Sequence, residues 1–459
     1  MYKINFDNPM HVHFLGIGGI SMSGIAKLLL SRGFKISGSD DTPSDITKEL
    51  ASLGADISYG LKADNITDGI KLAVYTAAIK PDNPEYTEAA KRGIPMLSRA
   101  EILGQIIDNY PQAIGVSGTH GKTTTTSMIS EILLSGNTDP TISVGAIYSR
   151  INSNFRVGAS PYFIFEACEY TNSFLSFYPK VGVILNVAAD HLDFFKDLND
   201  IRHSFRMYAD NIAEDGFLVI NGAIDNLEYF TKNLKAGFVT FGLTPDCDYF
   251  ADNISYNEFG FGSFDLVIKG KNIGRISLKQ PGIYNIENAL AAAAATHVSG
   301  IPADIIKVGL ESFGGANRRF QLKGTKDGVT VIDDYAHHPD EIRAALTAAK
   351  NYPHKKIWCV FQPHTFTRTK ALLNDFAKVL GLADEVVLAK IYPARETDTL
   401  GISSDNIRIL LEENGKSAVY LPTFEEIIKF LKKNCSPGDL LTTMGAGDVV
   451  NVGEMYLND

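Results

Sequence analysis

The order strand, glycine-rich turn, helix recurs along the chain and constrains its fold more than any other sequence feature. It begins with HVHFLGI and the turn GG, restarts with QAIGVSG after residues 108–111, and restarts again with VTVIDDY beyond residue 318. Such alternation is typical of βαβ units and parallel sheets. The 459 residues fit about three domains of roughly 150 residues each. The sequence therefore predicts an α/β protein with domains at 1–108, 109–317 and 318–459.

The composition is that of a globular chain with an acidic balance. Hydrophobic residues make up 45% of the sequence, enough for a core in each domain, which excludes a disordered chain. Asp and Glu outnumber Lys and Arg by 53 to 43, and the formal net charge is −10. Proteins that coat nucleic acid or anionic membranes need a basic surface, so the charge argues against both partners. The longest apolar runs, such as IWCVF at 357–361, are far too short to span a bilayer.

The N-terminus and the cysteines indicate a reduced, cytoplasmic protein. The first residues contain no basic stretch followed by a long apolar segment, so no secretory signal is predicted. The cysteines form no CxxC pair, and in a chain of this length they indicate neither a disulfide framework nor a zinc site. Cys359 lies within an apolar run and is expected in the core. The other cysteines are Cys168, Cys247 and Cys435.

The segment GTHGKTT at 118–124 lies between a predicted strand and a predicted helix. Glycines let backbone N–H groups turn toward phosphate oxygens, and a helix N-terminus adds partial positive charge. In such a loop Lys122 reaches the β- and γ-phosphates, and the Thr123 hydroxyl can bind Mg²⁺. Val116 stands where the usual pattern has glycine, but the combination of strand, Gly-Lys-Thr and helix disfavours an ordinary glycine turn. The predicted phosphate-binding residues are Gly118, Thr119, His120, Gly121, Lys122, Thr123 and Thr124.

Candidate metal ligands stand at two further strand ends. Glu166 closes the apolar run PYFIFEA, where a carboxylate needs a partner. Beside a phosphate loop the natural partner is Mg²⁺, which prefers oxygen ligands; a solvent-facing glutamate is the alternative. Glu169 lies beyond the strand end and is the weaker candidate. His191 follows the strand VGVILNV, and its spacing alone leaves open whether it binds a metal or is an ordinary surface or core histidine.

The segment GIGG at 16–19 is an incomplete dinucleotide-binding fingerprint. Ser21 occupies the position of the third glycine, and Asp40 ends the next predicted strand, where a carboxylate can bind a ribose hydroxyl. The match is weak for NAD and stronger for another ligand that contains a pyrophosphate; a purely structural turn is the alternative. The predicted contacts are Gly16, Gly18, Gly19, Ser39 and Asp40.

Polar clusters also follow the predicted strands of the C-terminal third. Arg318 and Arg319 offer guanidinium groups suited to phosphate. The segment DDYAHHP at 333–339 combines carboxylates with imidazoles, and QPHTFTR at 362–368 follows the next strand. Any one cluster could be a solvated loop. Ligands bind at the carboxyl ends of strands in open α/β sheets, however, so several clusters there favour a site.

Together these segments resemble the Mur ligase family, from about His11 to Gly447. The resemblance is carried by FLGIGGISMSGIA, SGSD, GTHGKTTTT, EACEY, ADH, NRRF, DDYAHHPDE, QPH and GAGD. It implies a Rossmann-like N-terminal domain for a UDP-sugar, a central P-loop ATPase-like domain for ATP, and a Rossmann-like C-terminal domain that brings the amino acid. The implied activity is ATP-dependent joining of L-alanine to the lactyl carboxylate of UDP-N-acetylmuramate through an acyl phosphate, in peptidoglycan precursor synthesis.

The resemblance also implies residue roles. Thr123, Glu166 and His191 would bind Mg²⁺. Beyond the phosphate loop, the implied ATP contacts are Asn288 to adenine, Arg319 to the γ-phosphate and Asp334 to the ribose. The residues implied to act in catalysis are Lys122, Glu166, His191, His338 and Arg368, with His338 as the candidate base for the amine. ATP and Mg²⁺ are expected, NAD is not, and the chain is expected to be a monomer or a homodimer.

Three positions depart from the family pattern. Tyr284 stands where the family often has His, and tyrosine can still stack and hydrogen-bond. Thr365 stands where some members have Arg, so Arg368 would carry that charge alone. Arg206 lies near the position of a carbamylated lysine in several sister ligases; arginine cannot form a carbamate, so no carbamylated lysine is predicted.

Three other functions remain open at this point. A sister ligase that attaches a recycled peptide to UDP-N-acetylmuramate would share most of these motifs. A non-catalytic P-loop nucleotide sensor would share the phosphate loop. An NAD-dependent oxidoreductase could use GIGG, but it would leave the Gly-Lys-Thr segment unexplained.

Overall fold

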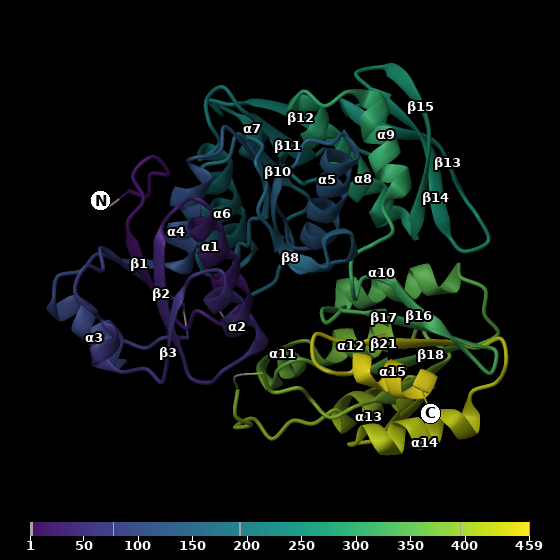
Figure 1. Ribbon diagram of the computed structural model, residues 1–459. Helices are drawn as coiled ribbons and strands as arrows, with labels where there is room; N and C mark the ends of the chain where they lie inside the picture. Colours follow the sequence, from purple (N-terminus) through teal and green to yellow (C-terminus); the bar gives the residue numbers. More distant parts are fainter. Residues whose placement is uncertain (1–2, 77, 192–193, 395, 459) are drawn as a thin grey trace. The chain divides into compact units, whose positions relative to one another are not determined.

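The computed structural model describes residues 3–76, 78–191, 194–394 and 396–458 (Figure 1). The chain divides into two compact units. The first comprises Met1–Phe250, Val267–Lys271 and Asn288–Gly309, and the second comprises Ala251–Leu266, Asn272–Glu287 and Leu310–Asp459. Three sheets with helices between their strands confirm the predicted α/β class.

The first sheet is five-stranded and parallel, in the order β3-β2-β1-β4-β5. Its order reverses between β1 and β4, and ligands bind outside the carboxyl ends of strands at such a reversal. This arrangement confirms the predicted Rossmann-like fold. The elements are β1 (His11–Leu15), α1 (Ile20–Ser31), β2 (Lys35–Asp40), α2 (Asp45–Ser52), β3 (Asp56–Tyr59), η1 (Ala63–Asn65), β4 (Leu72–Tyr75), α3 (Pro84–Lys91), β5 (Met96–Ser98) and α4 (Arg99–Ile107).

The second sheet has ten strands, in the order β15-β14-β13-β12-β11-β10-β6-β9-β7-β8. Strand β6 lies inside it, parallel to both β10 and β9. Its elements are β6 (Gln112–Ser117), α5 (Lys122–Ser135), β7 (Thr141–Tyr148), η2 (Ser149–Ile151), β8 (Ser153–Arg156), β9 (Tyr162–Glu166), η3 (Tyr170–Ser176), β10 (Val181–Ile184), α6 (Leu198–Asp210), β11 (Phe217–Asn221), α7 (Leu227–Thr231), β12 (Gly237–Gly242), β13 (Tyr249–Tyr256), β14 (Phe261–Ile268), β15 (Lys271–Pro281), α8 (Ile283–Val298) and α9 (Ala303–Ser312).

The third sheet has six strands, in the order β16-β17-β21-β18-β19-β20. Only β16 runs antiparallel to its neighbour; the other pairings are parallel. The elements are β16 (Gln321–Lys326), β17 (Val329–Asp334), α10 (Pro339–Lys350), β18 (Ile357–Phe361), α11 (Phe366–Ala371), α12 (Leu373–Leu380), β19 (Glu385–Leu388), α13 (Asp405–Glu413), β20 (Ser417–Tyr420), α14 (Phe424–Asn434), β21 (Leu440–Met444) and α15 (Val450–Asn458).

One hydrophobic core in the first unit joins residues of the first two sheets. Tyr110 packs against Phe163 with ring centroids 5.1 Å apart. Helix α1 comes so close to β8 that a Cβ atom at Gly24 would lie 2.5 Å from the ring of Phe155. The glycine in SMSG is therefore required by close packing rather than by backbone conformation.

The third sheet is covered on both faces. Alternate residues of β18 point into two separate cores, with Cys359 and Phe361 in one and Trp358 and Val360 in the other. Helices α10, α12 and α13 contribute to the first core, and α14 and α15 to the second. Cys359 is fully buried, as predicted, and burial raises the pKa of its thiol to about 12.

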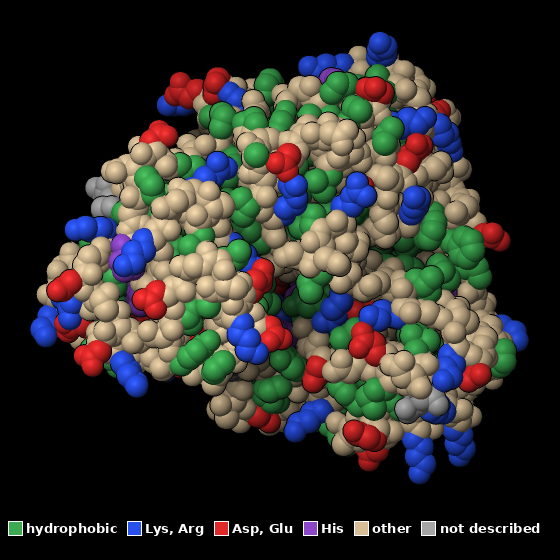
Figure 2. All heavy atoms as spheres, in the orientation of Figure 1, with side chains coloured by type: hydrophobic (Ala, Val, Ile, Leu, Met, Phe, Trp, Pro, Cys, Tyr) green, Lys and Arg blue, Asp and Glu red, His purple; other side chains and the backbone are tan. Residues whose placement is uncertain are grey.

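The surface carries charges of both signs. On the face shown in Figure 2, acidic and basic side chains are interspersed rather than separated into regions of one sign. Within the described residues, no helix is both long and apolar enough to cross a membrane.

Candidate active site

The phosphate loop joins the end of β6 to the N-terminus of α5. Gly118 and Gly121 have φ values of 140° and 87°, which residues with a side chain rarely adopt. A Cβ atom at Gly118 would lie 2.9 Å from the Cβ of Leu185, and one at Gly121 would lie 2.6 Å from Oδ1 of Asn288. Both glycines are therefore required by backbone conformation and by space.

The loop is fastened to the segment that follows β10. The backbone N–H of His120 donates to Oδ1 of Asn186 (2.9 Å), and Nδ2 of Asn186 donates to the carbonyl of His120 (3.0 Å). The Thr119 hydroxyl accepts from the backbone N–H of Ala188 (2.9 Å). These contacts hold the loop against the segment that follows β10.

Asn288, predicted to contact adenine, lies on α8 beside this loop. The Thr125 hydroxyl donates to its Oδ1 at 3.2 Å, and the residue is buried. The structure thus places Asn288 against the first turn of α5, and its contact with adenine stays a prediction.

Lys122 is folded back onto the loop. Its ammonium donates to the carbonyls of Gly118 and Thr119 and to both carboxylate oxygens of Glu169, at 3.1 and 2.9 Å. Burial by itself would lower the pKa of Lys122, but the charge of Glu169 outweighs it and raises that pKa. Lys122 is therefore a fully charged group at the N-terminus of α5.

The two glutamates of EACEY are placed differently. Glu166 ends β9, and its Oε1 accepts the backbone N–H of Gly145 on the adjacent strand β7. Glu169 is 2% exposed and pairs with Lys122. The glutamate that the sequence ranks as the weaker candidate is therefore the one that contacts the loop lysine.

His191 lies close to the same carboxylate. Its backbone has a φ of 52°, and its N–H donates to Oδ1 of Asp190 (2.7 Å). The imidazole lies over the ring of Tyr170 with centroids 4.6 Å apart, and its Nε2 is 4.0 Å from Oε1 of Glu169. Lys122, Glu169 and His191 thus form one cluster beside the phosphate loop.

A separate pocket of about 470 Å³ lies where the first sheet reverses its strand order. Its lining includes Gly16 and Asp40, both predicted, together with Thr76, Lys80 and Asn83. The carboxylate of Asp40 accepts the backbone N–H of Gly18 at 2.8 Å, so GIGG is held against the end of β2. This is the place at which an open α/β sheet binds a nucleotide.

The predicted contact Ser39 faces the interior. Ser39 is fully buried, and its hydroxyl donates to Oε2 of Glu85 at 2.6 Å. Asn65 also donates to Glu85. Ser39 therefore helps to hold the end of β2, and the sequence does not reveal its partner because Glu85 lies 46 residues away. Gly19 precedes α1 directly as its N-cap.

In the second unit, Asp334 ends β17 and is held by two backbone donors. The N–H groups of Phe320 and Ala336 donate to its carboxylate at 2.7 and 2.8 Å. Burial raises the pKa of Asp334 to about 6, against the opposing charge of Arg319. The guanidinium of Arg319 lies over the ring of Tyr335, 5.3 Å from its centroid.

The two arginines of NRRF have different environments. Arg318 donates to Asp333 (2.9 Å) and to the carbonyls of Gly447 (2.9 Å) and Gly445 (2.7 Å). It therefore joins the loop before β16 to the GAGD segment after β21. That leaves Arg319 as the better candidate for a phosphate contact, as the family resemblance implies.

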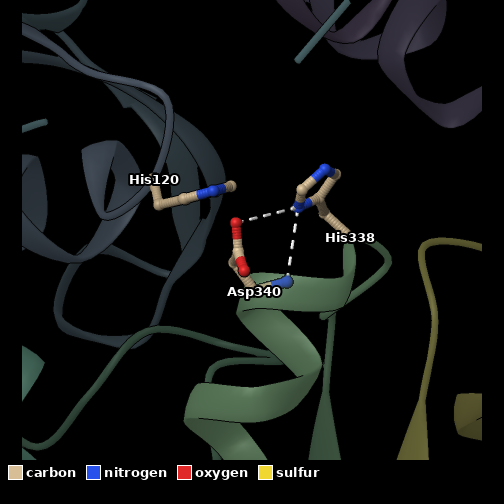
Figure 3. A group of neighbouring side chains, drawn as sticks. All are labelled: His120, His338 and Asp340. Atoms are coloured by element: carbon tan, nitrogen blue, oxygen red, sulfur yellow. Dashed lines mark hydrogen bonds and ion pairs between the residues drawn. The ribbon is translucent and has the colours of Figure 1, made fainter. Parts of the chain in front are cut away.

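His338 is the N-cap of α10, as Figure 3 shows together with Asp340. Its Nδ1 accepts the backbone N–H of Asp340 at 3.4 Å, and its own N–H donates to Glu341 at 3.2 Å. The side chain is largely buried. The cap fixes the imidazole at the carboxyl end of β17, beside His337.

His364 and Arg368 lie together after β18. Nη1 of Arg368 is 3.3 Å from Nδ1 of His364, whose ring stacks on Tyr392. Burial, His337 and Arg368 lower the pKa of His364 to about 4. Burial also lowers the pKa of His337, so both imidazoles are neutral at neutral pH. Tyr392 was not foreseen, because it comes from the loop after another strand.

Two of the three departures, Thr365 and Arg206, have structural roles of their own. The Thr365 hydroxyl accepts the backbone N–H of Arg368, so Thr365 caps α11. Arg206 binds Asp210 and the carbonyls of Tyr229 and Lys232, and so joins α6 to the α7 region. Burial, followed by the charge of Asp334, raises the pKa of Tyr284, which keeps its phenol neutral.

Comparison with known proteins gives three matches to family models. Residues 11–111 match the Mur ligase family catalytic domain, 116–296 the Mur ligase middle domain, and 318–447 the Mur ligase glutamate ligase domain. A UDP-N-acetylmuramate–L-alanine ligase of Agathobacter rectalis is 59% identical over 457 residues, which cover 100% of both chains.

Two solved structures are also similar. The UDP-N-acetylmuramate-alanine ligase of Thermotoga maritima has a TM-score of 0.79 and 31% identity, covering 97% of this chain and 98% of that one. A murein peptide ligase of Psychrobacter arcticus has a TM-score of 0.69 and 23% identity, covering 98% of each chain. At that identity the second likeness concerns the fold alone.

Proposed function

Because the chain belongs to the Mur ligase family, we propose that it joins L-alanine to the lactyl carboxylate of UDP-N-acetylmuramate in peptidoglycan precursor synthesis. The observation that carries this proposal is the full-length 59% identity to a ligase of that activity. The reaction consumes ATP and passes through an acyl phosphate. Two of its three substrates, ATP and the UDP-sugar, are nucleotides of the cell interior, so we place it in the cytoplasm.

We assign one substrate to each predicted domain. Residues 1–108 hold the UDP-sugar, for which the pocket lined by Gly16 and Asp40 has a suitable place and size. Residues 109–317 hold ATP on the phosphate loop, and residues 318–459 bring the amino acid. Gly18, Gly19 and Ser39 act on the UDP-sugar by shaping the loop and the end of β2.

ATP binds through Gly118, Gly121 and the N-terminus of α5, where backbone N–H groups and the helix dipole favour phosphate. Lys122 supplies the main fixed positive charge. Thr119, His120 and Thr124 complete the loop. Arg319 contacts the γ-phosphate, while Asp334 accepts a hydrogen bond from the ribose and Asn288 contacts adenine.

The donor groups beside the loop suit Mg²⁺. Thr123 offers a hydroxyl and Glu166 a carboxylate at the carboxyl end of β9, and oxygen ligands are those Mg²⁺ prefers. With His191, these residues would hold the ion. A bound Mg²⁺ would neutralise negative charge on the phosphate oxygens.

The chemistry has two steps. A carboxylate oxygen of the lactyl group attacks the γ-phosphorus, the bond to the β-phosphate oxygen breaks, and ADP leaves. Lys122 and Arg319 stabilise the charge on the transferring group. The neutral amine of alanine then attacks the acyl carbon, phosphate leaves, and the amine loses a proton. His338 is the proposed acceptor of that proton, and Arg368 orients the reacting carboxyl.

A phosphate-release assay tests the activity. ATP and UDP-N-acetylmuramate are supplied with single amino acids or with short peptides, and Lys122→Met serves as the inactive control. We expect phosphate release that depends on L-alanine. Release with a tripeptide but not with alanine would favour the recycled-peptide ligase. Nucleotide binding without any substrate-dependent release would favour a sensor.

A further inference from the structure

The Lys122 ammonium has an acceptor in the protein for each of its N–H donors. It donates to the carbonyls of Gly118 and Thr119 and to the carboxylate of Glu169. An ammonium group has three donors, so these contacts use its hydrogen-bonding capacity. A phosphate that binds Lys122 must therefore replace at least one of them.

Of the groups that accept a hydrogen bond from Lys122, the charged carboxylate of Glu169 is affected most when Lys122 moves away. Its side chain is 3% exposed, and its Oε2 lies 2.9 Å from Nζ of Lys122. The nearby His191 stands at 4.0 Å and compensates charge only when it is protonated. A buried carboxylate that loses its cation is strongly destabilised. When Lys122 turns toward a phosphate, Glu169 therefore requires a new positive partner.

We propose, on the basis of the function proposed above, that Glu169 is the counter-ion that holds Lys122 in the nucleotide-free loop and becomes a carboxylate for a divalent cation once Lys122 turns to the phosphates. Toward the phosphates Glu169 is a positioning residue, because it acts on them through Lys122. ATP and the cation then bind cooperatively, since each restores the charge balance that the other disturbs.

The first test measures ATP affinity by calorimetry on the full chain, with a chelator present and no metal. Glu169→Gln removes the charge that competes for Lys122 and keeps the shape of the side chain. We expect the variant to bind metal-free ATP about tenfold more tightly, the scale of one charge-assisted hydrogen bond. Equal affinities of the two proteins would overturn the proposal.

A matched control separates this effect from charge removal in general. Glu131 is also a buried carboxylate of the central domain, and it accepts from Tyr148. Glu131→Gln should leave the affinity for metal-free ATP unchanged. A gain as large as that of Glu169→Gln would contradict a role specific to the Lys122 contact.

A double-mutant cycle tests whether Glu169 acts through the lysine. In a Lys122→Met background the ammonium that Glu169 contacts is absent. Glu169→Gln should then change ATP affinity by less than about twofold, because the interaction between the two side chains has already been removed. An undiminished gain would mean simple repulsion between Glu169 and the phosphates, and the proposal would be wrong.

If Glu169 also binds the cation, the effect of Mg²⁺ on ATP affinity should differ between the unsubstituted chain and Glu169→Gln. Mg²⁺ should tighten ATP binding to the unsubstituted chain more than to Glu169→Gln. Equal tightening in both proteins would contradict a role for Glu169 toward the cation.

A direct structural measurement remains available if Glu169→Gln does not fold, as judged by its melting curve. In a crystal of the unsubstituted chain with ATP and no metal, Lys122 should lie beyond hydrogen-bonding distance of Glu169. An intact pair in that complex would overturn the proposal. A chain that binds no ATP under any condition would instead contradict the proposed function.

Discussion

Lys122→Met should separate the phosphate site from the UDP-sugar site. Methionine keeps an unbranched side chain of similar length but removes the ammonium. The loss of a preorganised charge on the transferring phosphate is expected to cost about 10²–10³-fold in turnover or more. Affinity for UDP-N-acetylmuramate should stay unchanged, because the pocket that we assign to it is lined only by residues between Gly16 and Pro84.

The same substitution has a calculable effect on stability. The side chains of Lys122 and Glu169 are 15% and 3% exposed, so the variant leaves a buried carboxylate without its partner. Breaking a buried ion pair costs about 3–5 kcal/mol, and the partial exposure of Lys122 favours the lower end of that range. The entropy of unfolding is about 2.1 cal/mol/K per residue, so in the first compact unit a loss of about 3 kcal/mol lowers the melting temperature by roughly 5 °C. Adding Glu169→Gln should recover most of that loss.

Three measurements check this prediction: phosphate release, calorimetric titration with UDP-N-acetylmuramate, and scanning calorimetry of the single and double variants. A fall in UDP-sugar affinity that matches the fall in turnover would refute the separation of the two sites. A melting temperature unaffected by Lys122→Met would refute the importance of the ion pair.

Three further predictions concern other parts of the molecule. Glu166→Ala should raise the Mg²⁺ concentration needed for half-maximal turnover, and an unchanged titration would remove Glu166 from the metal site. The pKa of Asp334 is raised from 3.8 to about 6 by burial. Between these two pKa values the carboxyl of Asp334 is protonated in the folded state and ionised in the unfolded state. Protonation therefore contributes about 3 kcal/mol to the stability of the folded state below pH 3.8, and this contribution is lost as the pH rises through 6. Melting temperatures measured from pH 4 to 7 should fall less in Asp334→Asn than in the unsubstituted chain, and equal slopes would contradict this. Gly24→Ala should lower the free energy of unfolding. The added methyl group overpacks against Phe155 at a cost of about 1–3 kcal/mol, which should exceed the roughly 1 kcal/mol gained in helix propensity. Gly314→Ala, where a Cβ meets nothing within 4 Å, is the control in urea unfolding.

The sequence predicted the features that depend on neighbouring residues. The phosphate loop is an example, because an apolar strand, glycines with positive φ and a helix start all lie within 112–135. The α/β class follows from the repetition of such units, so it too could be predicted.

The features that were missed depend on contacts between distant segments. Glu166 was preferred because it ends a predicted strand. Glu169, however, is the glutamate that contacts Lys122, and these two residues are 47 positions apart in the sequence. The only sign of Glu169's role in the sequence was that EACEY contains a second glutamate three residues after Glu166. In the same way, Arg318 is committed to the loop after β21, more than 125 residues away. Residue type and spacing do not separate it from Arg319.

Product analysis by mass spectrometry is the most direct measurement of ATP-dependent L-alanine ligation. The chain is incubated with ATP, Mg²⁺, UDP-N-acetylmuramate and an equimolar mixture of L-alanine and a tripeptide. We predict a product heavier than the UDP-sugar by one alanine residue, with one ADP and one phosphate formed per product. A tripeptide adduct, or phosphate release without any adduct, would mean that the chain is not an L-alanine ligase.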